Sequence, residues 1–401
     1  MSGASFQSPR DARISADPPL DAKVRAVFAS VSPRFLRADG IYGAGALPSI
    51  VFPDPIDAAL QPFWHGTEMV ETLTFLRLNP HAPPQARPLF RPDTIHWFVS
   101  VTRDIAYEQG RDYLLDAATG MLTLPPGSRI PFKTFAELIP FVEQKLPFAY
   151  DDARLFHFRQ VEIAYRHAPG LWRGPMPEPA MAQLPRTLAK LKAHAPLRLL
   201  VLGDSISQGA GASRAIKVAP GLPDYVEQVV RGIERASGST VALDNRARGG
   251  WAAQSGAHLA ATERPGRAAP DLVLIAFGMN DITFMHSGYA DRYGLANYTS
   301  SIASATAALR ADAPGCEFIL ISSMFGNGEN ALFPPADFLA FRDALRSLTG
   351  PGVALADVTG LLEAMLKAKS WYDLTYSGIN HPNDFMHRIY AQAILALLIG
   401  E

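Results

Sequence analysis

The chain has 401 residues, of which 48% are hydrophobic and 19% are charged, and its formal net charge is −1. This balance is typical of a globular protein, and the length accommodates two or three domains. A net charge so close to zero provides no basic excess to attract nucleic acid or an anionic membrane surface, so we expect neither as a partner. The single cysteine, Cys316, excludes an intrachain disulfide and a cysteine-based metal site.

The first 45 residues predict an N-terminal arm. Residues 1–20 are polar and interrupted by prolines, and they lack the apolar stretch of a signal peptide. The sequence contains no run of about 18 apolar residues, so no membrane span is predicted. On these grounds we expect a cytoplasmic protein.

Residues 46–168 have the pattern of a β domain. Apolar and polar residues alternate in short runs, which is typical of half-buried strands. The clearest runs are Thr72–Leu76, Ile95–Val101 and Gln160–Tyr165. Turn residues separate such runs, and we predict a β-sandwich of jelly-roll type.

Residues 169–195 contain several prolines and predict a linker to a second domain, residues 196–401. In this domain apolar runs alternate with helical segments, which favours a parallel sheet covered by helices on both faces, a three-layer α/β/α architecture. The expected strands are Leu197–Leu202, Thr240–Leu243, Leu272–Phe277, Phe318–Ile321 and Val353–Ala356. A final helix is expected over His387–Leu398.

Ser205 stands just beyond the first of these strands, in the segment Gly203-Asp204-Ser205. Reactive groups of open parallel sheets lie beyond the carboxyl ends of the strands, so a substrate can reach this hydroxyl. A serine hydroxyl needs a nearby base and donors for the oxyanion before it acts as a nucleophile. Asp204 is expected to brace the loop of the nucleophile.

Candidates for these partners follow later strands. Gly249 and Gly250 follow the second strand, and either glycine amide could approach a reacting carbonyl, with the spacing from Asn245 favouring Gly250. Asn280 follows the third strand and offers a side-chain amide, and its neighbour Asp281 is expected to hold the loop through backbone hydrogen bonds. The general base is expected to be His381, directly before Pro382 and the final helix.

Four sequence blocks in this order resemble those of the SGNH (GDSL-like) hydrolases. The blocks are Gly-Asp-Ser at 203–205, Asn-x-x-x-Gly-Gly at 245–250, Gly-x-Asn-Asp at 278–281 and His-Pro at 381–382. The resemblance implies a serine esterase without cofactor or metal. It implies Ser205 as the nucleophile and His381 as the base, with an oxyanion hole formed by the amides of Ser205 and Gly250 and by the side chain of Asn280.

The sequence departs from the family at the third member of the triad. The family places an aspartate three residues before the histidine, and here that position is Gly378. The imidazole still needs an acceptor for its other N–H, and three remain open: Asp384, Asp373 or a backbone carbonyl. The last would make the site a Ser–His dyad, and a β-sandwich before such a domain resembles the layout of family 2 carbohydrate esterases.

The expected activity is hydrolysis of short-chain esters, in particular acetyl esters, on a carbohydrate. The expected partner is therefore a small ester or an acylated carbohydrate. Two other functions fit the same sequence. One is a lysophospholipase or thioesterase, with an acyl groove lined by the aromatic residues near the motifs, Trp251, Phe284, Trp371 and Tyr372. The other is a non-catalytic carbohydrate-binding relative whose site has lost the aspartate. The sequence indicates no oligomeric state.

Overall fold

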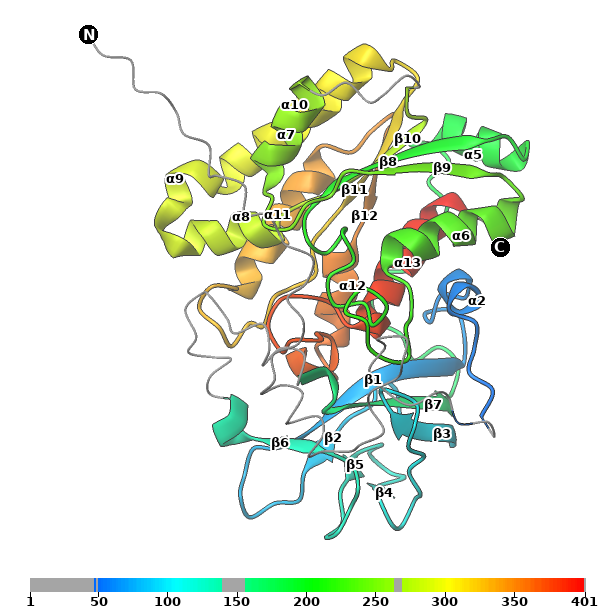
Figure 1. The fold of residues 1–401 in the computed structure, drawn as a ribbon, viewed down its shortest axis with the longest axis vertical. Coiled ribbons are helices and arrows are strands. Elements are labelled where there is room, and N and C mark those ends of the chain that lie inside the picture. The colour runs from blue at the N-terminus through cyan, green and yellow to red at the C-terminus, as the bar shows by residue number, and fades with distance from the viewer. Residues whose placement is uncertain (1–46, 48–49, 139–155, 263–268, 400–401) are drawn as a thin grey trace.

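The structure, a computed structural model, describes residues 47, 50–138, 156–262 and 269–399. The predicted arm over residues 1–45 lies outside the described residues. Two parts follow one another along the chain, a strand-rich part and then an α/β part, and they pack together in Figure 1.

The α/β part is built on a five-stranded parallel sheet. Its strands stand in the order β12-β11-β10-β8-β9. They are β8 (Leu197–Gly203), β9 (Val241–Asn245), β10 (Leu272–Ala276), β11 (Glu317–Ile321) and β12 (Val353–Ala356). All five strands predicted from apolar runs are therefore confirmed, with ends that differ by at most two residues.

Helices cover both faces of this sheet (Figure 1). Helices α6 (Tyr225–Ser237) and α13 (Asp384–Leu398) pack together on one face, and α7 (Ala253–Thr262) and α10 (Leu295–Asp312) pack together on the other. Because the sheet has no solvent face, its central strands are apolar at consecutive positions rather than at alternate ones. Leu272 to Ile275 of β10 are all fully buried.

Further helices occupy the connections. They are α5 (Pro185–Lys192), α8 (Met279–Phe284), the π-helix Met285–Tyr289, α9 (Ala290–Tyr293), α11 (Pro335–Ser347), α12 (Val358–Met365) and the 3₁₀ helix Trp371–Asp373. Helix α13 begins three residues before the predicted start at His387, because the side chain of Asn383 accepts the amide of Met386 and caps the helix.

The strand-rich part forms one mostly antiparallel sheet in the order β3-β7-β1-β2-β5-β4, with β6 parallel to β1. Its strands are β1 (Glu68–Arg77), β2 (Gln85–Ala86), β3 (Thr94–Ser100), β4 (Leu114–Leu115), β5 (Leu122–Thr123), β6 (Phe132–Thr134) and β7 (Gln160–Arg166). The three predicted strands correspond to β1, β3 and β7. This antiparallel sheet is compatible with the predicted sandwich.

Helix α2 (Pro55–Leu60) and the Pro-rich segment 169–195 connect the two parts closely. Helix α2 packs on α6 and α13. In the Pro-rich segment, the amide of Ala180 donates to the carbonyl of Leu397 at 2.9 Å, and the carbonyl of Gln183 accepts from the amide of Gly352 at 2.8 Å. The segment predicted as a linker is thus hydrogen-bonded to the α/β part at Ala180 and Gln183.

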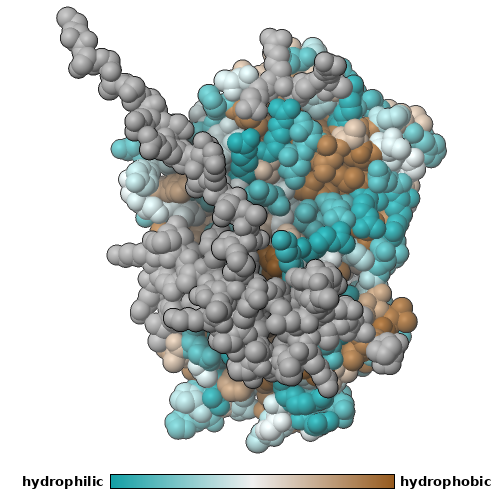
Figure 2. Space-filling view, viewed as in Figure 1, coloured by the Kyte–Doolittle hydropathy of each residue, from teal (hydrophilic) through white to brown (hydrophobic). Residues whose placement is uncertain are grey.

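The surface agrees with the near-neutral charge. Figure 2 shows hydrophilic and hydrophobic residues interspersed over the coloured part of the visible face. No helix among the described residues is long and apolar enough to cross a membrane.

Candidate active site

The loop that carries Ser205 leaves β8 through a crowded turn at Gly203. A Cβ atom at this position would lie 2.2 Å from Oγ of Ser207 and 3.1 Å from the carbonyl of Ala276, so only glycine fits. Asp204 then accepts the amide of Ile206 at 2.9 Å, as expected for a residue that braces the loop. Ser205 itself is half-buried at the carboxyl end of the sheet.

His381 lies on a loop whose two ends pair with each other. Thr375 and Pro382 form an isolated antiparallel bridge, and inside it the amide of Tyr376 donates to the carbonyl of His381 at 3.1 Å. Nε2 of His381 lies 2.8 Å from Oγ of Ser205. The structure therefore brings the predicted nucleophile and base into hydrogen-bond contact.

Burial, and after it the positive charge that His387 can carry, lowers the pKa of His381 to about 4. The imidazole is consequently neutral near pH 7, the state in which Nε2 can accept a proton from Ser205. No carboxylate is among the causes of this shift. A nearby carboxylate would raise the pKa instead.

The two acidic candidates for the third position hydrogen-bond elsewhere. Asp384 accepts the amide of Ser213 at 2.7 Å, its second oxygen is buried without a hydrogen-bond partner, and burial raises its pKa to about 7. Asp373 accepts the amides of Thr74 and Ser370, at 2.7 and 2.9 Å. Within the described part of the chain, no carboxylate hydrogen-bonds the ring of His381. The structure does not bring Asp384 to the position expected of an orienting acid.

Gly378, which stands at the position of the usual aspartate, adopts a φ of +74°. Its loop is held by Asn327. Asn327 follows β11 and is fully buried. Its side chain donates to the carbonyl of Gly378 at 3.0 Å, and its backbone amide donates to the carbonyl of Ile379. Sequence reasoning missed Asn327, although its place beyond the carboxyl end of an apolar strand was a usable signal.

The candidate oxyanion donors lie beyond β10 and β9, the two neighbours of β8 in the sheet. Nδ2 of Asn280 donates to the carbonyl of Trp251 at 2.9 Å, which fixes the direction of the amide and leaves its second hydrogen available. Gly249 stands beside Ser205, because a Cβ on it would lie 3.7 Å from Cβ of Ser205. Its amide donates to Oε1 of Gln208 at 3.0 Å. The amide of Gly250 has no partner among the described contacts, so Gly250 remains the candidate donor.

Asp281, beside Asn280 on α8, bonds the backbone of the segment after Gly250, whereas the sequence predicted that it holds its own loop. Its carboxyl oxygens accept the amide of Ala253 at 3.1 and 3.2 Å, so the loop of Asn280 holds the loop of Gly250. Burial raises the pKa of both Asp281 and Asp204 to about 7. Both carboxyls lie beneath the site and act on backbone amides rather than on a substrate.

A parallel sheet with a Ser–His contact beyond its carboxyl ends has the layout of a serine hydrolase. Residues 201–389 match the GDSL-like Lipase/Acylhydrolase family. This match, together with the Ser–His contact, supports a carboxylic ester hydrolase. No curated protein matches the chain by sequence.

Several solved structures resemble about half of the chain. The lipase Lip_vut3 from a goat rumen metagenome is 15% identical with a TM-score of 0.41, and the match covers 51% of this chain and 99% of that one. A two-domain esterase (CEX) active on acetylated mannans is 20% identical with a TM-score of 0.42, over 56% of this chain and 53% of its own. The acetylxylan esterase Axe2 of Geobacillus stearothermophilus is 19% identical with a TM-score of 0.41, over 52% and 97%. At such scores the likeness carries no information on the substrate of this chain.

Proposed function

We propose that the chain hydrolyses short-chain esters, in particular acetyl esters, of a carbohydrate. The reaction passes through an acyl-enzyme formed on Ser205, with His381 as the general base. The observation that carries the proposal is the 2.8 Å contact between Oγ of Ser205 and Nε2 of His381. This contact, on a loop at the carboxyl end of a parallel sheet, supplies the nucleophile and the base that acyl transfer requires.

In the first half of the reaction, Oγ of Ser205 attacks the ester carbonyl carbon while Nε2 of His381 takes the hydroxyl proton. The carbonyl oxygen becomes an oxyanion, which accepts hydrogen bonds from the amides of Ser205 and Gly250 and from Nδ2 of Asn280. When the carbon–oxygen bond to the alcohol breaks, His381 returns the proton to the departing alkoxide. The acyl group stays on Ser205 as an ester.

In the second half, a water molecule attacks the carbonyl of the acyl-enzyme and His381 takes one of its protons. The same donors receive the negative charge. Collapse of the intermediate breaks the bond to Oγ of Ser205, which recovers its proton from His381. The products are the carboxylic acid and the free enzyme.

A Ser–His dyad is the form of the site that we propose. In the described residues the ring of His381 has no carboxylate partner, while its loop is fixed through backbone carbonyls by Asn327 and through the pairing of Thr375 with Pro382. A ring held in place by its backbone needs less help from an acceptor to keep Nε2 directed at Ser205.

The surroundings of Ser205 support a small acyl group on a large alcohol. Arg248, Gly249 and Gly250 are exposed, so one side of the site is open. Next to them Trp251 is half-exposed, with the guanidinium of Arg248 5.0 Å from its ring centroid. An aromatic face beside hydrogen-bond donors suits a sugar ring, which is apolar on its faces and polar at its edge.

Turnover of 4-nitrophenyl acetate, octanoate and palmitate, together with acetate release from acetylated oligosaccharides, tests the proposal. We expect the highest kcat/KM for acetate and release of acetate from the oligosaccharides. A clear preference for the long chains would instead favour the lysophospholipase or thioesterase function. No turnover of any ester would favour the non-catalytic carbohydrate-binding relative.

A further inference from the structure

One buried side chain of the N-terminal sheet contacts the segment that carries His381. Gln160 is the first residue of β7 and is 1% exposed. Its Nε2 donates to the carbonyls of Tyr372 and Thr375, both at 2.8 Å. Thr375 is the residue that pairs with Pro382 across the base of the histidine loop. Gln160 thus fixes the segment that leads into that loop.

The same side chain also reaches the segment that follows His381. Oε1 of Gln160 accepts from Nδ2 of Asn383 at 3.4 Å. Asn383 in turn donates to the carbonyl of Asp373 at 2.8 Å and caps α13 by accepting the amide of Met386. Gln160 therefore contacts residues on both sides of His381, and Asn383 joins these two sides to each other.

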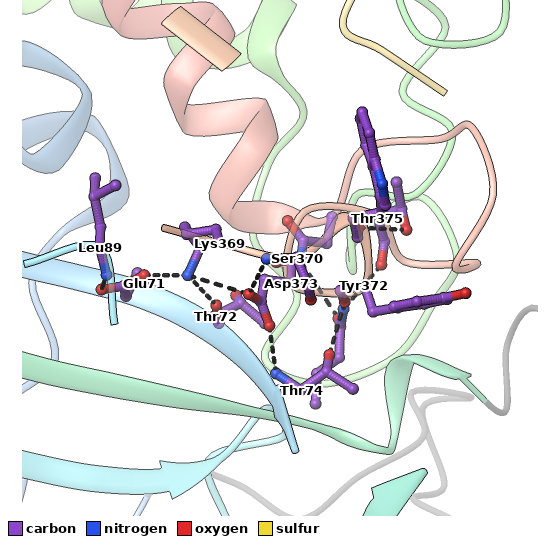
Figure 3. A network of polar contacts seen from close by, with 12 residues as sticks. Glu71, Thr72, Thr74, Leu89, Lys369, Ser370, Tyr372, Asp373 and Thr375 are labelled. Carbon is purple, nitrogen blue, oxygen red and sulfur yellow. Dashed lines mark hydrogen bonds and ion pairs between the residues drawn. The ribbon is translucent and has the colours of Figure 1, made fainter. Parts of the chain in front are cut away.

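The neighbouring strand strengthens the attachment. Thr74 of β1 stands directly opposite Gln160 in the ladder between β1 and β7. Its hydroxyl donates to the carbonyl of Tyr372 at 2.7 Å, and its amide donates to Asp373 at 2.7 Å. Figure 3 shows these contacts together with Lys369, which is paired with Glu71 on the same strand. The sheet accordingly provides a rigid base for the histidine loop.

We propose that Gln160 is a positioning residue for His381, so that the N-terminal sheet completes the active site of the hydrolase domain. This inference rests on the proposed role of His381 as general base. Since no carboxylate of the described residues bonds its ring, the imidazole depends on its backbone for orientation. A base must stay within hydrogen-bond reach of the nucleophile, and a displacement of about 1 Å can cost on the order of 100-fold in rate.

Gln392 of α13 provides a matched control. It is 2% exposed, and its Nε2 donates to the carbonyls of Ala58 and Gln61, at 2.8 and 2.9 Å. Both glutamines therefore join the N-terminal part to the α/β part through hydrogen bonds to two backbone carbonyls. Only those bonded to Gln160 belong to the segment that carries His381.

The experiment compares Gln160→Met and Gln392→Met, which keep the length of the side chain and remove its donors. We expect both variants to lower Tm, because each removes the two hydrogen bonds that Nε2 of a buried glutamine donates to backbone carbonyls. We expect Gln160→Met to lower kcat on 4-nitrophenyl acetate by about 10- to 100-fold at nearly unchanged KM. Gln392→Met should keep kcat within about two-fold of wild type. Equal kcat losses in both variants, or none in Gln160→Met, would overturn the inference.

If Gln160→Met does not fold, Gln160→Glu serves instead. At a pH low enough to keep this buried carboxyl protonated, it retains the acceptor for Asn383 and one donor. It should then lower kcat by a smaller factor, and wild-type kcat would overturn the inference. His381→Ala separates this inference from the proposed function. An inactive wild type, or an active His381→Ala, contradicts the proposed function itself. An active wild type that needs His381 but tolerates Gln160→Met contradicts only the positioning role.

Discussion

His381 contacts Ser205 through Nε2 at 2.8 Å, yet no carboxylate in the described residues hydrogen-bonds its ring. Nε2 therefore contacts the nucleophile, whereas no acid of the described residues bonds the ring from its other side. The consequences of this arrangement can be measured in the acid candidates, in the pH dependence and in the oxyanion donors.

Asp384→Asn should leave kcat/KM within about three-fold of wild type. An aspartate that orients a catalytic histidine is worth about 10⁴-fold, and replacement by asparagine removes that effect. In this structure Asp384 accepts the amide of Ser213, which an asparagine oxygen can also do. Steady-state kinetics on 4-nitrophenyl acetate measures the ratio, and a loss approaching the larger figure would establish a triad.

The same substitution should change the pH dependence of stability. Burial raises the pKa of Asp384 to about 7, from an ordinary value of 3.8. A raised pKa contributes stability that is complete below 3.8 and is lost as the pH rises through about 7, because the folded state then holds a buried charge. Asp384→Asn should therefore gain stability relative to wild type as the pH rises over this interval. Denaturant unfolding at several pH values checks this, and a difference that does not vary with pH would contradict it.

The acid limb of kcat/KM should lie near pH 4 rather than at the ordinary histidine value of 6.5. Burial lowers the pKa of His381 to about 4, and only the neutral ring can take the proton of Ser205. Activity should thus persist at pH 5 and disappear as the pH falls through about 4. A circular dichroism spectrum at each pH shows whether the chain is still folded. A midpoint at or above 6.5 in folded protein would mean that the ring is less buried than the structure has it.

Asn280→Ala should lower kcat by about 10²- to 10³-fold, with a smaller effect on KM. The side chain of Asn280 is aligned by its bond to the carbonyl of Trp251, so its second hydrogen is directed before the oxyanion forms. Trp251→Phe is a useful companion, because it keeps this backbone carbonyl and changes only the ring. Equal kcat for Asn280→Ala and wild type would remove Asn280 from the oxyanion hole.

Much of the α/β part could be predicted from local patterns. Parallel strands buried on both faces leave continuous apolar runs, and the carboxyl ends of such strands indicate where Ser205 and Asn280 must lie. Asp384 was harder to place, because its direction depends on where α13 begins. The cap at Asn383 starts the helix at Asp384 and directs the carboxylate to Ser213.

Gln160 could not be predicted at all. It lies more than two hundred residues before the segment that it holds, in an alternating strand where an inward polar side chain looks like any other. Its role follows from how the two parts of the chain pack, which no local pattern reports. The same reason hides the pairing of Lys369 with Glu71 beneath the histidine loop.

Labelling with a fluorophosphonate probe tests the central claim most directly, because the probe reacts only with a serine that a base has activated. We expect wild type to be modified at Ser205, as located by peptide mass spectrometry. Ser205→Ala should not be labelled, and His381→Ala should react at least about 100-fold more slowly. Equal labelling of Ser205→Ala, or a wild type that the probe does not modify, would contradict Ser205 and His381 as the catalytic pair.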